Sequence, residues 1–122
     1  MPYRIIIADD DADLRAVFRR ITQRVYPTAI INTVADGDAA LDLYAQHGAD
    51  LLLADQVMTP VDGPTLIRTL RAHGATLPII ATSSTPSAQT DMLAAGATVF
   101  LIKLDAVDQL EMILPTLLPV EP

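Results

Sequence analysis

The residues of this 122-residue sequence best suited to chemistry are charged or hydroxyl groups placed directly after short apolar runs. Three acids, Asp9–Asp11, follow the first run, and Asp55 follows a later one. Carboxylates that converge repel one another, and some of them resist ionisation. A hard divalent cation relieves this repulsion, and oxygen ligands completed by water suit Mg²⁺. These acids indicate a magnesium site if the fold brings the ends of the two runs together.

Ser83 and Lys103 follow two further apolar runs and extend the chemistry to phosphoryl transfer. A carboxylate beside Mg²⁺ can attack phosphorus and form an acyl phosphate. Such a transfer depends mainly on positioning and on neutralising the charge of three phosphoryl oxygens. Mg²⁺ could take one oxygen, the Lys103 ammonium a second, and the Ser83 hydroxyl or nearby N–H groups a third. The set is sufficient for an aspartyl-phosphate site at Asp55.

The strands and helices that must position these residues can be predicted from the pattern of apolar residues, which alternates between short continuous runs and helical spacing. Short apolar, β-branched runs predict five strands, over Tyr3–Ala8, Ala29–Val34, Asp50–Ala54, Leu77–Thr82 and Thr98–Ile102. Helical spacing with Pro or Gly boundaries predicts five helices, over residues 14–25, Gly37–Gly48, Pro64–Gly74, Ser87–Gly96 and Asp105–Leu114. Asp11 is expected to cap the first helix. The alternation predicts a parallel sheet covered on both faces, with its ligand site beyond the carboxyl ends of the strands.

Composition disfavours several other classes of function. The net charge of −7 and the pI of about 4.4 argue against direct binding to nucleic acid. No apolar run approaches the roughly 18 residues needed to cross a bilayer, so no membrane contact is expected. The N-terminus lacks a signal-peptide pattern, and the absence of Cys is compatible with a cytoplasmic location. The four basic residues of the first helix, Arg15, Arg19, Arg20 and Arg24, are interpreted as its solvated outer face.

Four segments, in order, resemble the receiver domain of two-component response regulators of the chemotaxis type. They are "IIIADDD", "DQVMTPVDG", "PIIATSS" and "AGATVFLIK", and the resemblance covers residues 3–114. It implies an α/β fold of three layers, flavodoxin-like and (βα)5, with a doubly wound parallel five-stranded sheet in the order 2-1-3-4-5. It also implies one receiver domain over residues 1–122, with its core at 3–114 and a proline-rich tail or linker start at 115–122.

The resemblance assigns roles to the acids and to the loop that follows the third strand. It implies Asp55 as the phosphoacceptor. It implies Asp9, Asp10 and Asp55 as the ligands of the cofactor Mg²⁺. Met58 and Thr59 fall in the site loop, where Thr59 replaces the family's proline.

The resemblance also implies the residues that contact the phosphoryl group and carry the switch. Lys103 matches the site lysine, and Phe100 matches the switching aromatic residue. The family's hydroxyl residue lies five positions after a proline, and Pro78 plus five is Ser83. Ser83, rather than Thr82, is therefore the expected switch hydroxyl.

Three departures from the family pattern bear on the switch. The proline of the site loop is displaced by one place, at Thr59–Pro60. Lys103 is followed by Leu104 instead of proline, and a trans peptide bond is expected there because a non-proline cis bond costs roughly 2.5–4 kcal/mol. Ser83 and Lys103 are 20 residues apart, about two fewer than usual in the family. Separately, Pro115 is expected to end the last helix early.

The function implied by the resemblance is a phosphorylation-controlled binding module, which catalyses only its own phosphorylation and dephosphorylation and is otherwise not an enzyme. A histidine kinase or phosphotransfer protein would donate the phosphoryl group. A downstream protein target or a fused output domain would read the result on a face formed by the fourth helix, the fifth strand and the fifth helix. The same face leaves open a homodimer.

Three alternatives compete with this interpretation. A degenerate receiver that binds partners without phosphorylation is favoured by the departures and opposed by the complete set of acids and lysine. A phosphatase of the haloacid-dehalogenase type needs a second acid two residues after the first, where this chain has Val57. A flavodoxin-like cofactor binder would need a phosphate-binding loop after the first strand, where Asp9–Asp11 repel phosphate.

Overall fold

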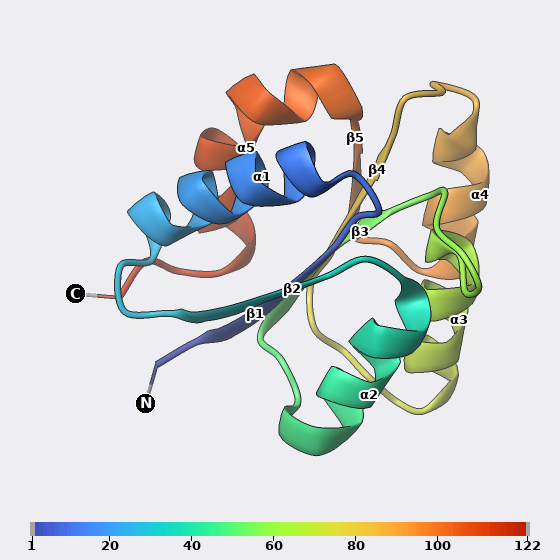
Figure 1. The fold of residues 1–122 in the computed structure, drawn as a ribbon, viewed down its shortest axis with the longest axis horizontal. Coiled ribbons are helices and arrows are strands. Elements are labelled where there is room, and N and C mark those ends of the chain that lie inside the picture. Colours follow the sequence, from blue (N-terminus) through green and yellow to red (C-terminus); the bar gives the residue numbers. More distant parts are fainter. Residues whose placement is uncertain (1, 122) are drawn as a thin grey trace.

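Five parallel strands alternate with five helices in the computed structural model, which describes residues 2–121 (Figure 1). The strands are β1 (Arg4–Ala8), β2 (Ile30–Val34), β3 (Leu51–Asp55), β4 (Ile79–Ser83) and β5 (Val99–Ile102). The helices are α1 (Ala12–Val25), α2 (Gly37–His47), α3 (Gly63–Ala72), α4 (Ala88–Ala95) and α5 (Lys103–Leu117). The sheet order is β2-β1-β3-β4-β5 and every pairing is parallel, so the predicted fold class and strand order are confirmed.

The helices form two layers on opposite faces of the sheet. Figure 1 shows α1 and α5 together on one side, and α2, α3 and α4 on the other. Successive side chains of a strand point to opposite faces, so alternate residues serve the two layers. In β3, for example, Leu53 packs under α1 and α5, whereas Leu52 packs under the other three helices. All residues of β3 and β4 are buried, which explains why these strands are continuous apolar runs in the sequence.

Aspartates fix the start of three helices by accepting hydrogen bonds from free backbone N–H groups. Asp11 accepts from the N–H groups of Asp13 and Leu14, which confirms it as the cap of α1. Asp36 caps α2 and Asp62 caps α3 in the same way. The cap of α1 uses the third acid of the Asp9–Asp11 run, so the first two acids remain available to the site.

The last helix runs to Leu117, so the expectation that Pro115 ends it early is wrong. A proline removes one N–H donor, whose acceptor would be the carbonyl of Glu111, an exposed residue. Burial of Leu114 and Leu118 holds the segment against the core. The Tyr26 hydroxyl also donates a 2.6 Å hydrogen bond to the Leu118 carbonyl.

Met1 and Pro122, which belong to the predicted domain and tail, lie outside the described residues. Across residues 2–121, no helix combines the length and the apolar character that a membrane span requires.

Candidate metal-binding and phosphoacceptor site

The acids that the sequence singles out meet at the carboxyl edge of the sheet. Asp55 is the last residue of β3, and Asp9 directly follows β1, which pairs with β3. Asp9 and Asp55 are buried, at 1% and 3% exposure, whereas Asp10 is exposed. One carboxylate oxygen from each of the three lies within 4.8 Å of the others. Strand pairing alone therefore brings together residues 46 positions apart in the chain.

Lys103 supplies the positive charge of this cluster. Its Nζ lies 2.9 Å from Oδ2 of Asp55 and 3.2 Å from Oδ1 of Asp9. Because β4 lies between β3 and β5, the side chain reaches across the end of β4 to make these contacts. The peptide bond to Leu104 is trans, as expected, and within residues 2–121 the one cis bond is Thr59–Pro60.

Burial is the dominant influence on the titration of these groups. It raises the pKa of Asp55 to about 6, with the Lys103 hydrogen bond opposing and the charge of Asp9 adding to the shift. Burial also raises the pKa of Asp9, against the hydrogen bond from the Asp11 N–H and the charge of Lys103. For Lys103, burial favours the neutral form, but hydrogen bonding and charge from Asp55 outweigh it and the pKa is raised. The cluster thus holds more carboxylate charge than one lysine offsets.

The donor set fits Mg²⁺. Oδ2 of Asp9 is buried and has no hydrogen-bond partner among the described residues. Leaving a charged oxygen buried and unpaired is costly, whereas a cation in contact with it removes the cost. All three candidate ligands are carboxylate oxygens, the ligand type that Mg²⁺ prefers. Asp9, Asp10 and Asp55 are therefore the residues that would hold the ion.

Backbone hydrogen bonds fix the loop that follows Asp55. The Gln56 N–H lies 2.8 Å from the Thr82 carbonyl and 2.9 Å from Oδ1 of Asp55. The Gln56 carbonyl accepts a 2.9 Å bond from the N–H of Gly63, which starts α3. At Gly63 an added Cβ would lie 2.1 Å from the Asp55 carbonyl oxygen, so only glycine permits this approach.

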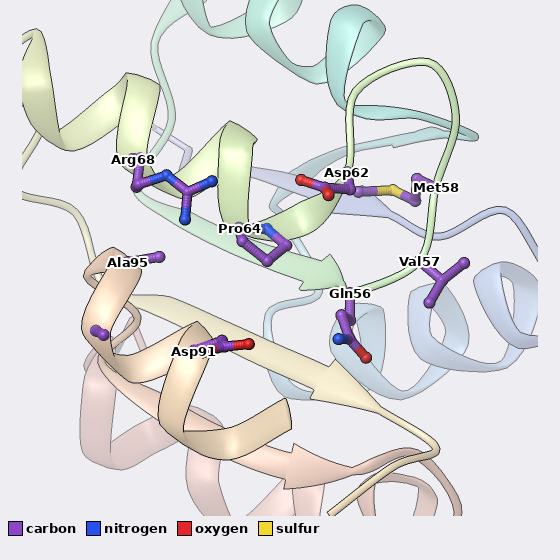
Figure 2. Close-up of a pocket in the computed structure, with 9 residues that line it drawn as sticks. Gln56, Val57, Met58, Asp62, Pro64, Arg68, Asp91 and Ala95 are labelled. Carbon is purple, nitrogen blue, oxygen red and sulfur yellow. The ribbon is translucent and has the colours of Figure 1, made fainter. Parts of the chain in front are cut away.

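The loop borders a groove of about 690 Å³ that it shares with α3 and α4 (Figure 2). Met58 and Arg68 line this groove, together with Asp91 of α4. Met58 is buried in the core below α3, while Thr59 at the tip of the loop is exposed. The groove therefore lies beside the site rather than between the acids themselves.

The two predicted switch residues are not part of the hydrogen-bonded cluster of acids and lysine. Leu53 faces α1 and α5, so strand alternation directs Asp55 to that side. Ser83, the last residue of β4, directs its hydroxyl to the side chain of Gln56. Phe100, opposite Ala81 in β5, is half-buried and packs with Ala81 on the side of α2, α3 and α4. The structure thus gathers Asp9, Asp10, Asp55 and Lys103, but not the switch pair.

Gln56 and Arg15 lie near the site but were not identified as site residues from the sequence. The Ser83 hydroxyl donates a 2.6 Å hydrogen bond to Oε1 of Gln56. Arg15 donates a 2.8 Å bond from Nη1 to the Asp9 carbonyl, so its interpretation as a purely solvated residue is wrong. Being four positions after the helix cap, it lies on the first turn of α1, where it can reach back to the site. The other three arginines of α1 are exposed.

Comparison with known proteins identifies the family of this chain. A model of the response regulator receiver domain family matches residues 5–114. Response regulator MprA of Mycobacterium sp. (strain KMS) is 34% identical over 112 residues, which are 90% of this chain and 48% of that protein. A protein-glutamate methylesterase/protein-glutamine glutaminase of Nocardioides sp. (strain ATCC BAA-499 / JS614) is 31% identical over 82% of this chain and 28% of that protein. The chain spans about half the length of these curated relatives, or less.

Solved structures show the same fold. A putative response regulator from Chloroflexus aurantiacus superposes with a TM-score of 0.86 at 25% identity, over 96% of this chain and 98% of that one. The chemotaxis response regulator CheY4 of Vibrio cholerae superposes with a TM-score of 0.84 at 22% identity, over 97% and 100%. The family match over 5–114, the strand order and the cluster of acids and lysine lead to one conclusion: the chain belongs to the response regulator receiver domain family of two-component signalling.

Proposed function

We propose that Asp55 accepts a phosphoryl group from a histidine kinase or a phosphotransfer protein, and that this modification controls a partner-binding face. The observation that carries the proposal is the grouping of Asp9, Asp10 and Asp55 within 4.8 Å, with Lys103 bonded to Asp55. Asp55 ends a rigid, fully buried strand, so its carboxylate is presented to a donor in a fixed position.

The residues of the site have different roles in the phosphoryl transfer. A carboxylate oxygen of Asp55 attacks phosphorus, the P–N bond of the donor's phosphohistidine breaks, and its electron pair returns to the imidazole nitrogen. Lys103 provides a cation within hydrogen-bonding distance of Asp55, where it can offset charge on the phosphoryl oxygens. Asp9, Asp10 and Asp55 would hold Mg²⁺, which when bound supplies further positive charge for those oxygens.

The output of the switch is proposed to lie on the face formed by α4, β5 and α5. Phe100 is half-buried there, and Leu93 and Val107 are exposed apolar residues on the flanking helices. A downstream protein target, a fused output domain or a second copy of the chain would bind this face. Cytoplasmic location and the assignment of residues 1–122 to one receiver domain are part of the same proposal.

A second candidate is a degenerate receiver that binds partners without phosphorylation. The observation that favours it is the Ser83 hydroxyl, which donates its hydrogen bond to Gln56 and not to a residue of the acid cluster. The complete set of Asp9, Asp10, Asp55 and Lys103 favours the phosphorylated form, and we give it the greater weight.

Intact mass after incubation with acetyl phosphate and Mg²⁺ separates the two candidates. The expected result is a gain of one phosphoryl group that is absent in Asp55→Asn and in the presence of EDTA. A folded wild-type protein that binds Mg²⁺ but gains no mass would support the degenerate receiver instead.

A further inference from the structure

The predicted switch hydroxyl is already engaged by a side chain of the site loop. Ser83 Oγ donates its proton to Oε1 of Gln56 at 2.6 Å and accepts a 3.0 Å bond from the Thr85 N–H. Ser83 is 2% exposed, so water cannot readily replace either partner. A hydroxyl has one proton to donate. While Ser83 gives it to Gln56, it cannot give it to a phosphoryl oxygen on Asp55.

Gln56 is held in a position that makes this competition direct. It follows Asp55 in the chain, and its backbone is fixed at both ends, by the Thr82 carbonyl and by the Gly63 N–H. Its side chain extends from the end of β3 toward the end of β4 (Figure 2). The side chain is half-buried and lines the 690 Å³ groove, so a released amide can turn to solvent without leaving a buried polar group unpaired.

We propose that Gln56 is a positioning residue that holds Ser83 in the unphosphorylated arrangement and so opposes the switch. The inference rests on the proposed function, because it takes Asp55 as the phosphoacceptor. When a phosphoryl group is present, Ser83 turns from Gln56 and donates its hydrogen bond to a phosphoryl oxygen, and the Gln56 amide turns to the groove. No covalent bond changes in this step. The Gln56–Ser83 hydrogen bond thus sets part of the balance between the two arrangements.

The test measures the affinity for beryllofluoride, a mimic of the phosphoryl group, at saturating Mg²⁺ by fluorine NMR titration. The variants are Gln56→Leu, Ser83→Ala and the double variant. Gln46→Leu is the matched control, because Gln46 is exposed near the end of α2, which leads to the start of β3, whereas the site lies at the end of β3. Gln56→Leu is expected to tighten beryllofluoride binding by roughly two- to tenfold, the range that one neutral hydrogen bond accounts for. Gln46→Leu should leave the affinity unchanged.

The double variant distinguishes positioning from a general loosening of the loop. In the Ser83→Ala background, Gln56→Leu should have no further effect, because the hydroxyl that Gln56 holds is gone. An unchanged or weaker affinity in Gln56→Leu would overturn the inference and leave the proposed function standing, as would an equal gain in both backgrounds. Wild-type protein that binds Mg²⁺ but not beryllofluoride would overturn the proposed function, and the inference with it.

Discussion

Lys103 Nζ lies 2.9 Å from Asp55 and 3.2 Å from Asp9, so a single ammonium group serves two buried carboxylates. The pKa values of both acids remain raised despite this contact, because burial outweighs it. In the absence of a bound cation, the site therefore reduces the stability of the fold at neutral pH.

Removing the lysine should destabilise the protein. Lys103→Met leaves two buried carboxylates without their cation, so the free energy of unfolding at pH 7 should fall by about 3 kcal/mol. Urea unfolding in EDTA measures this change. Arg20→Met removes one exposed positive charge from α1 and should change stability by less than about 0.5 kcal/mol. Equal effects of the two substitutions would contradict the role given to Lys103.

Neutralising Asp55 should stabilise the protein at pH 7 but not at pH 4. The pKa of Asp55 rises from 3.8 to about 6 on folding, so the folded state binds the proton more tightly than the unfolded state. The stability that this group contributes is present below pH 4 and is lost as the pH rises through 6. Asp55→Asn mimics the protonated acid at every pH. It should raise the free energy of unfolding at pH 7 by up to about 3 kcal/mol, and by little at pH 4.

Thermal or urea unfolding of Asp55→Asn at several pH values, in EDTA, measures this dependence. Asp42→Asn on α2, where the carboxylate is exposed, serves as the control and should show no such trend. A gain in stability that is the same at pH 4 and pH 7 would argue that the effect is not one of ionisation.

Two of the three consecutive acids, Asp10 and Asp11, should respond differently to substitution by Asn. Asp10 is exposed and belongs to the metal cluster, so Asp10→Asn should weaken Mg²⁺ binding by about tenfold or more with little effect on stability. Asp11→Asn should preserve both properties, because Asn caps a helix as well as Asp does. Calorimetric titration with MgCl₂ compares the two. Equal losses of affinity would show that only the summed charge of the run matters.

Substitution of Gly63 should destabilise the protein because there is no room for a side chain at this position. An added Cβ would lie 2.1 Å from the Asp55 carbonyl oxygen, a backbone atom that cannot move without moving the phosphoacceptor. Gly63→Ala should therefore lower the free energy of unfolding by about 3 kcal/mol or more.

Gly74→Ala provides the contrast for this substitution. An added Cβ there meets nothing within 4 Å, and the φ of +87° makes the cost one of backbone strain, about 1 kcal/mol. Urea unfolding measures the loss of stability in both variants, which is due to steric crowding in Gly63→Ala and to backbone strain in Gly74→Ala. Gly63→Ala with wild-type stability and Mg²⁺ affinity would contradict the structural reason for this glycine.

Much of the fold and the position of the site could be predicted from the sequence. Continuous apolar runs such as Leu51–Ala54 indicate strands buried on both faces, and parallel pairing brings their carboxyl ends to one edge. The pairing of β1 with β3 places Asp9 beside Asp55, and the long side chain of Lys103 reaches both acids across the end of β4. Local hydrogen bonding also explains Asp11, since a helix cap is decided within four residues.

Other features were decided only by the tertiary structure. The extension of α5 past Pro115 depends on the burial of Leu118 against distant parts of the chain, which outweighs the local preference of proline. The hydrogen bond between Ser83 and Gln56 joins side chains 27 residues apart, one at the end of β4 and one in the loop that follows β3. Sequence patterns specify which face of a strand a residue occupies. The choice of hydrogen-bond partner depends on rotamers and distances that exist only once the strands are paired.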